Sequence, residues 1–558
     1  MWSKYFKAVE KMYIWDALYG KIEFESLIYK CMLSPEVQRL REVRLCNINS
    51  LCITGSSNTN RFEHSIGTAY LASINIESEA QAHLKMSKNE KEIFIISALL
   101  HDVANGPFGH SYEYIREKQG FVPEKGLRDI FSLEGSGENK VEHKFSPIFF
   151  GKLKSLSNIL KETQQSQIEE ILSARHPLGE LISSSIDLDN IDNVFRMAYH
   201  MGIHFTKEAP IKLAQCMYMS KEGNIVFKRE AETYLNEWFE VRQKVYKFLL
   251  LNPQEFAGKY MLTEAMDILF ECISQNKAMD TDNKPIYVDW HNTDYDLMLA
   301  LNGLTEVWLS RKILLYESID KNVITDIIKN SDERERKIAL QNYLESFELA
   351  LPIKKKGKSG DSKKLQLDQN CKLTITGNGI IEIQDRNMNF EINGNKLYKV
   401  VNIRYNPSQI VSRLMTGDLY DCLMILETND IDKYEEFLDY SSRIMIEAEL
   451  ETMIKSDNTF SSVDIGIHPI LDVNKTERQL KIIFDDADAP TIIGHTASRK
   501  LLVGVFLKNA PFGLSHGNIP LAKHRSKLSD IVIAYFNAYF QDGAIEVTLY
   551  EEADKYGN

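Results

Sequence analysis

The chain has 558 residues, of which 44% are apolar and 26% are charged, which is ordinary for a soluble globular protein. This length predicts roughly two to four structural units. The formal net charge of −13 argues against an extended surface for nucleic acid, although a local basic pocket could still hold a small polyanion.

The cysteine pattern and the N-terminal segment bear on the expected cell compartment. The seven cysteines are scattered and lack CxxC spacing. This pattern is typical of reduced thiols in the cytosol rather than of a disulfide framework or a structural zinc site. Residues 1–6 lack the apolar segment of a signal peptide, and no apolar run is long enough to cross a membrane. We therefore expect a cytoplasmic, soluble protein that does not associate with membranes.

The first part of the chain reads as helical. Apolar residues recur at helical spacing in four segments, 91–100, 167–172, 234–251 and 297–315. Residues 1–350 are therefore expected to form one mainly helical domain. The lysine-rich run KKKGKSGDSKK interrupts this pattern, and we expect residues 351–364 to be a linker or a mobile loop.

Beyond that run the apolar spacing changes from helical to alternating. The sequences GNG at 377–379 and NG at 393–394 each separate two extended runs, so both predict hairpin turns. Further strands are expected at 481–484, 501–507 and 545–549, and an amphipathic helix is expected at 530–540. Residues 365–558 are therefore predicted to form an α+β region with a regulatory or oligomerising role.

Three motifs carry candidate metal ligands. The apolar run ALL ends in His101 and Asp102, RFEHS places His64 37 residues before His101, and IDLDNID places Asp189 87 residues after Asp102. Two imidazoles and two carboxylates are the ligand set of a mononuclear metal phosphohydrolase, and this mixed shell suits Mn, Fe or Mg. Such a metal would acidify water and polarise a phosphorus centre.

The ordered motifs resemble the HD-domain deoxynucleoside triphosphate triphosphohydrolases, the group that contains bacterial dGTP triphosphohydrolases and the vertebrate SAM-and-HD-domain enzyme. The resemblance covers residues 14–250 and is carried by six segments: IWD to GKI at 14–22, SPEVQRLR at 34–41, RFEHSIG at 61–67, HD to GPFGH at 101–110, EHKFS at 142–146 and IDLD to YHMGI at 186–203. It implies a mainly α fold, with a helical HD-domain core followed by the C-terminal α+β lobe. It also implies cleavage of a dNTP into deoxynucleoside and inorganic triphosphate by attack at the α-phosphorus.

The resemblance assigns one divalent metal to His64, His101, Asp102 and Asp189. It selects Asp189 over its acidic neighbours, so Asp187 is expected to be a helix cap or a solvated acid.

The resemblance also implies roles in catalysis and in substrate binding. His110 and His143 match histidines that contact the phosphates and assist proton transfer to the leaving 5′-oxygen, which suits the pKa of imidazole. Glu113 stands where an acid orients a catalytic histidine. Arg61 matches an arginine that contacts phosphate, and Tyr246 matches a tyrosine that contacts the sugar.

Four positions in the substrate pocket depart from the family pattern. Asn105 replaces a histidine beside the phosphates, while Asn190, Asn193 and Met197 replace a lysine, a tyrosine and an aspartate of the vertebrate enzyme. Asn105, Asn190 and Asn193 remain candidate substrate contacts. Because Asn193 is smaller than tyrosine, discrimination against ribonucleotides is expected to be weaker than in the family.

The predicted function is a metal-dependent dNTP triphosphohydrolase, and two alternatives stay open. One is a nucleotide-sensing regulatory protein with weak or conditional catalysis, and the other is an HD phosphodiesterase or nuclease. The resemblance further implies a homo-oligomer, control by an allosteric nucleotide and a context of antiviral nucleotide depletion.

Overall fold

The computed structural model describes residues 11–46, 58–117, 130, 155–304, 306–316, 318–329, 332–344, 372–376, 380–384, 389–456, 460, 463–487, 489–494, 499–511, 521–541, 543 and 545–546. His143 and the predicted linker at 351–364 lie outside the described residues.

Helices make up most of the described chain as far as residue 303. They are α1 (Ser26–Met32), α2 (Pro35–Gln38), α4 (Arg61–Ile76), α5 (Lys88–Leu100), α6 (His110–Glu117), α9 (Leu156–Ile159), α10 (Glu162–Leu172), α11 (Leu188–Met201), α12 (Ala209–Cys216), α13 (Glu232–Leu251), α14 (Pro253–Ser274) and α15 (Asp294–Gly303). The helices predicted at 91–100, 167–172 and 234–251 are confirmed within α5, α10 and α13. Helix α4 packs against α5 and α11, and these three helices carry the candidate metal ligands.

Short two-stranded ribbons lie beside this helical core. They pair β1 (Lys11–Asp16) with β2 (Gly20–Glu25), β3 (Met217–Met219) with β4 (Ile225–Phe227), and β12 (Gln479–Ile482) with β13 (Thr491–Gly494). A parallel bridge joins Phe227 to Phe484, so a segment near the C-terminal end of the chain packs against the helical core.

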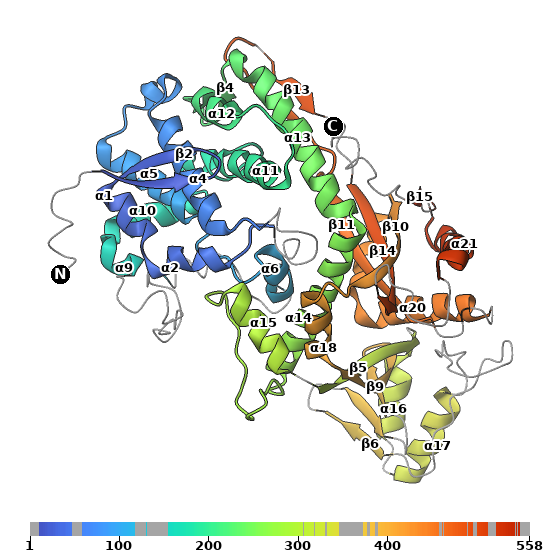
Figure 1. The fold of residues 1–558 in the computed structure, drawn as a ribbon. Coiled ribbons are helices and arrows are strands. Elements are labelled where there is room, and N and C mark those ends of the chain that lie inside the picture. The colour runs from blue at the N-terminus through green and yellow to red at the C-terminus, as the bar shows by residue number, and fades with distance from the viewer. Residues whose placement is uncertain are drawn as a thin grey trace.

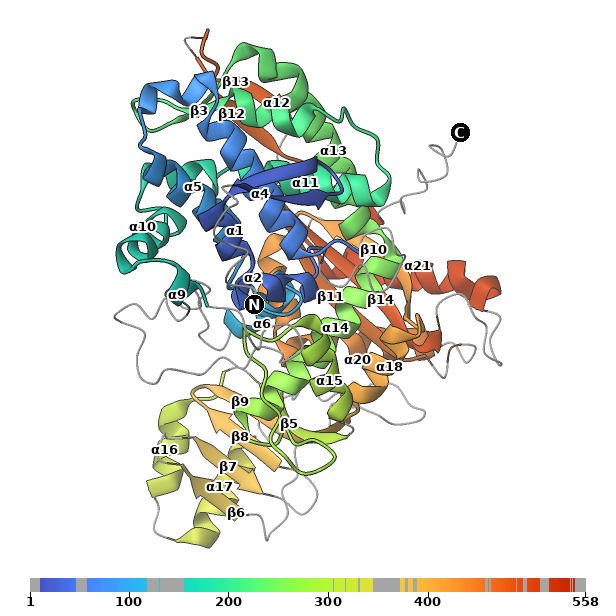
Figure 2. The ribbon, with the colours of Figure 1, turned by 60° about the vertical axis from the view of Figure 1, so that its left-hand side comes forward.

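A five-stranded antiparallel sheet takes strands from both sides of residues 351–364. Its order is β5–β9–β8–β7–β6, formed by β5 (Val307–Tyr316), β6 (Lys372–Ile375), β7 (Ile381–Gln384), β8 (Asn389–Asn393) and β9 (Lys396–Tyr405). The register of β6 with β7 and of β8 with β9 confirms the two predicted hairpins. Figure 2 shows this sheet at the lower end of the molecule with α16 (Lys321–Lys329) and α17 (Glu333–Leu344) beside it.

The sheet corrects the predicted end of one helix and bears on the predicted domain boundary at residue 350. The helix predicted over 297–315 is wrong in its second half, because α15 ends at Gly303 and residues 307–316 form β5. Val307, Leu309 and Ile313 are buried at even spacing, a strand period that pairing with β9 satisfies along its length. A boundary at residue 350 would also separate β5 from the strands that complete its sheet.

The rest of the C-terminal region contains a four-stranded antiparallel sheet in the order β11–β14–β10–β15. Its elements are α18 (Pro407–Met415), β10 (Tyr420–Thr428), α19 (Tyr434–Leu438), α20 (Tyr440–Lys455), β11 (Ile465–Val473), β14 (Arg499–Pro511), α21 (Leu521–Tyr539) and β15 (Ile545–Glu546). Alternate residues of β14 serve two cores, since Leu502 and Phe506 join the main cluster whereas Val503 and Val505 face α20 and α21.

The long consecutive helices α13 and α14 lie between the N-terminal helices and this four-stranded sheet (Figure 1). The main hydrophobic cluster runs from α4 and α5 through α14 to residues of β10, β11 and β14, so the helical core and the sheet share one core. None of the helices in the described part of the chain has the length and apolar character needed to cross a membrane.

Candidate metal centre and adjoining cavity

Two histidines are positioned by the ends of neighbouring helices. Asn60 caps α4 by accepting a hydrogen bond from the backbone N–H of Glu63 at 3.0 Å, which places His64 in the first turns of that helix. His101 is the residue that ends α5, directly after the fully buried Leu100. Because α4 and α5 pack together, both imidazoles reach the same point.

The start of α11 supplies a carboxylate to the same point. Asp187 caps this helix and accepts a hydrogen bond from the backbone N–H of Asn190 at 2.6 Å, which confirms the prediction that Asp187 is a cap. Asp189 lies in the first turn, and its side chain remains 30% exposed towards the cavity described below.

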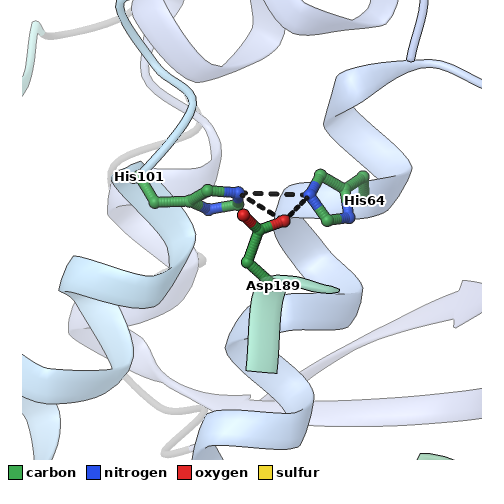
Figure 3. Close-up of side chains that lie close together, drawn as sticks. All are labelled: His64, His101 and Asp189. Atoms are coloured by element: carbon green, nitrogen blue, oxygen red, sulfur yellow. Dashed lines mark hydrogen bonds and ion pairs between the residues drawn. The ribbon is translucent and has the colours of Figure 1, made fainter. Parts of the chain in front are cut away.

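Each imidazole uses one nitrogen for support and turns the other to the centre (Figure 3). His101 Nδ1 donates to the carbonyl of Ala98 at 2.8 Å, and His64 Nδ1 donates to Asp192 Oδ2 at 2.7 Å. The two Nε2 atoms lie 3.1 Å apart, and Asp189 Oδ1 lies 2.8 Å from His64 Nε2. One ligand atom from each of His64, His101 and Asp189 lies within 4.8 Å of the others, as a shared ion requires.

Asp102 stands at the edge of this group. Its Oδ2 atom is 3.9 Å from His64 Nε2 and 3.7 Å from His101 Nε2. Arg61 donates to the same oxygen, and Asn105 Nδ2 donates to Oδ1 at 2.8 Å. Burial alone would raise the pKa of Asp102, but the charges of Arg61 and the two histidines hold this pKa at about 2.

The donor set and its electrostatics fit a divalent cation. Burial by itself would lower the pKa of His101, yet Asp102 and Asp189 raise it to about 10, so their charges favour a cation at this point. Two neutral imidazoles and carboxylate oxygens are suitable ligands for Mn, Fe or Mg.

A buried ionic network behind His64 was not predicted from the sequence. Asp192 accepts the Nδ1 hydrogen of His64 and two hydrogen bonds from Arg196, whose Nη1 also donates to Asp16 at 3.0 Å. Tyr19 donates to Asp192 at 2.8 Å. Such partners fix the tautomer and orientation of a ligating imidazole. The spacing of Asp189, Asp192 and Arg196 on one face of α11 was the available sequence signal, but the partners from residues 16–19 had none.

A cavity of about 480 Å³ opens beside the ligands, a volume suited to a small molecule. Of the residues predicted from the sequence, its walls contain His64, Asp102, Asp189, Arg61, His110, Asn193, Met197 and Tyr246. His110 Nδ1 lies 2.7 Å from Glu113 Oε2, which orients the exposed imidazole as the sequence predicted.

Two predicted substrate contacts point elsewhere. The amide of Asn105 is used by Asp102, and the amide of Asn190 donates to both carboxylate oxygens of Asp187. Neither asparagine lines the cavity.

The opposite part of the wall comes from α14 and from residues beyond 430, which the sequence had not connected with the site. It contains Lys259, Tyr260, Thr263, Glu264, Asp267, Tyr434, Leu438, Arg443, His468, Pro469, Ile470, Leu471 and Lys475. The C-terminal region therefore forms part of the cavity that adjoins the metal centre.

Comparison with known proteins agrees with this placement of the site. The HD domain family model matches residues 61–197, a segment that contains the three clustered ligands and Asp102. The chain is also similar to a phosphohydrolase structure from Bacteroides thetaiotaomicron VPI-5482, with a TM-score of 0.48 and 14% identity over 89% of this chain and 99% of that one.

Three relatives share about a quarter to a third of their aligned residues with this chain. An uncharacterized protein from Bacillus subtilis, YwfO, is 26% identical over 43% of this chain and 52% of its own length. The deoxynucleoside triphosphate triphosphohydrolases SAMHD1 of Homo sapiens and Danio rerio are 25% and 32% identical, over 42% and 45% of this chain and 40% and 44% of their own lengths. The matched region thus spans about half the length of these relatives, and the chain carries a match to the HD domain at residues 61–197.

Proposed function

We propose that the protein is a metal-dependent triphosphohydrolase that cleaves a (deoxy)nucleoside triphosphate into nucleoside and inorganic triphosphate. The observation that carries this proposal is the convergence of His64, His101 and Asp189 at the wall of a cavity of nucleotide size. The similarity to SAMHD1 proteins supports the choice of substrate.

The residues around the cavity have separable roles in this proposal. His64, His101, Asp189 and Asp102 would hold the metal, which supplies Lewis acidity and an activated water when it is bound. His110, whose Nδ1 lies 2.7 Å from Glu113 Oε2, would pass a proton to the leaving oxygen. Arg61 keeps Asp102 ionised and presents its charge at the cavity wall.

Product analysis tests the proposal directly. The protein is incubated with each dNTP and rNTP in the presence of Mg, Mn or Fe, and the products are separated by anion-exchange chromatography. We expect nucleoside and triphosphate to appear together, and the H101A variant to form neither. Nucleoside monophosphate with diphosphate, or release of single phosphates, would contradict the proposal.

The sugar side of the cavity bears on selectivity. Asn193 and Met197 line the cavity where bulkier or acidic residues occur in the vertebrate enzyme, so we expect ribonucleotides to be cleaved alongside deoxyribonucleotides. Nucleotide binding without turnover under every metal condition would favour the nucleotide-sensing alternative, in which Asn105 and Asn190 are engaged with acidic residues instead of substrate.

A further inference from the structure

Two lysines line the part of the cavity wall that α14 and the C-terminal region supply. Lys259 of α14 is half-buried, and Lys475 follows β11 with an exposed side chain; both line the cavity. Neither ammonium group makes a hydrogen bond or an ion pair with any residue in the described ranges, and the same is true of the Arg478 guanidinium. By contrast Glu264, which lines the same wall, is already paired with Lys508 at 3.0 Å.

The segment that carries Lys475 is held in place. Asp472 accepts a hydrogen bond from the backbone N–H of Lys475 at 2.8 Å, and Arg242 of α13 donates to the Lys475 carbonyl at 2.7 Å. Arg242 also lies over the ring of Tyr246, 4.5 Å from its centroid. These contacts hold Lys475 beside Arg242, and the charges of Lys259 and Arg478 act on the same pair, Lys259 on Lys475 and Arg478 on Arg242.

Their surroundings favour loss of positive charge unless an anion is present. Burial, with repulsion from Lys475, lowers the pKa of Lys259 to about 8, and burial lowers the pKa of Arg242 to about 10. Asp472 attracts Lys475 and Arg242, and Asp187 attracts Arg478, whereas no acidic group among the described residues offsets the burial of Lys259. A bound anion would supply the missing counter-charge.

The cations lie near the metal centre. The cavity wall contains Asp189, Tyr246 and both lysines, and the hydroxyl of Tyr246 interacts electrostatically with Asp189, Arg242 and Arg478. A chain of phosphates that begins at the metal ligands and passes Tyr246 would therefore meet these positive charges.

We propose that Lys259 and Lys475, supported by Arg242 and Arg478, bind the phosphate chain of the nucleoside triphosphate, so that the C-terminal region completes the substrate site. This inference rests on the proposed function. The lysines would also replace phosphate contacts that Asn105 and Asn190 do not supply, because the amides of these asparagines donate to Asp102 and Asp187. Lysine suits this role because its ammonium group is a compact charge with three donors.

Inorganic tripolyphosphate is the probe for a calorimetric binding test. K259M/K475M removes two charges and keeps the aliphatic stems, whereas K207M/K221M removes two exposed charges outside the cavity. We expect K259M/K475M to bind tripolyphosphate at least tenfold more weakly than the wild type, and the control to bind within twofold. K475M alone changes only an exposed side chain and should show part of the loss in tripolyphosphate affinity. K475R keeps the positive charge and should bind tripolyphosphate as the wild type does.

The same proteins separate this inference from the proposed activity. In the H101A background the lysine-dependent difference in tripolyphosphate binding should persist, because it does not require the metal. Equal binding by wild type and K259M/K475M would overturn the inference whether or not nucleotides are cleaved. Lysine-dependent binding without any nucleotide cleavage would support the anion site and refute the triphosphohydrolase.

Steady-state kinetics distinguish a substrate site from a separate regulatory anion site. With nucleotide as substrate, K259M/K475M should raise KM about tenfold while kcat changes less than threefold, and tripolyphosphate should compete with nucleotide in the wild type. Tripolyphosphate that binds through the lysines but does not compete with nucleotide would overturn the assignment to the substrate phosphates.

Discussion

At the scale of single residues, each of the two histidines uses one ring nitrogen as a hydrogen-bond donor and leaves the other available to a cation. His64 and His101 each donate from Nδ1 to a fixed acceptor, so the lone pair of Nε2 is free to bind a cation. Two such lone pairs 3.1 Å apart repel each other unless a positive charge lies between or beside them. A proton on His101 or a metal ion removes this repulsion, so the arrangement favours a bound cation.

Removal of a ligand should abolish metal binding without unfolding the protein. H101A, D189N and D102N are each expected to lose the bound metal and the activity, because each removes a donor from one small group. D187N should keep both, since asparagine caps a helix as well as aspartate does. Elemental analysis after dialysis, with circular dichroism to verify folding, provides the measurement. Full metal content in H101A and D189N would contradict the assignment.

Glu255 should make stability depend on pH. It is 1% exposed, its carboxylate oxygens have no hydrogen-bond partner among the described residues, and burial raises its pKa to about 9. The unfolded chain has a glutamate pKa of about 4.3. Between these values only the folded state holds the proton, so stability should fall as pH rises, by about 1.4 kcal/mol per pH unit.

Urea unfolding from pH 5 to pH 8 tests this prediction. E255Q cannot ionise, so its unfolding free energy relative to the wild type should rise by about 1.4 kcal/mol per pH unit across that range. E162Q, at an exposed position, should follow the wild-type curve. Parallel curves for wild type and E255Q would show that Glu255 is ionised in the folded state.

At the scale of secondary-structure elements, local sequence signals located the helices and the metal ligands. The motifs at residues 64, 101 and 189 each sit at a helix end, where apolar spacing and capping residues define the boundary. The pairings of β6 with β7 and of β8 with β9 were predictable for the same reason, because turn residues act locally.

Features that depend on distant parts of the chain were not predictable from one sequence. Arg196 meets Asp16, which lies 180 residues away, and β5 was mistaken for the continuation of a helix because its partner β9 lies about 90 residues further on. Nothing in the sequence near Lys475 indicated that this residue would line the cavity. Long-range pairing decides each of these cases.

Close packing of α4 on α11 should be essential for the metal centre. A Cβ atom at Gly67 would lie 2.0 Å from Asp192 Oδ1 and 2.3 Å from Arg196 Nη2. G67A must therefore displace the ion pair that holds His64. We expect a loss of about 1–3 kcal/mol in unfolding free energy and metal binding weaker by about 10–100-fold.

Gly303 of α15 offers a matched control for that substitution. A Cβ there meets its nearest atoms at 3.8 Å, an ordinary contact, so G303A should leave stability unchanged or slightly higher and should not affect the metal. Urea unfolding and metal titration measure the two effects. Wild-type metal affinity in a destabilised G67A protein would show that the ionic network does not orient His64.

At the scale of the whole molecule, the helical core and the C-terminal region are joined at several places. The main hydrophobic cluster continues from α14 into β10, β11 and β14, and β5 pairs with β9 over ten residues. The cavity draws residues from both regions. The C-terminal region is therefore part of the folded body that forms the cavity.

Proteolysis should cut the chain without separating its halves. The lysines at 354–364 predict preferred trypsin cleavage within that run. Because β5 lies before this run and β9 after it, the two fragments should remain bound through the backbone hydrogen bonds of the sheet and the shared core. We expect two bands in denaturing electrophoresis but a single peak in size-exclusion chromatography, which splits only in denaturant. Fragments that separate in native buffer would instead mean that residues 1–350 fold as an independent domain, because β5 would then be stable without its partner strand.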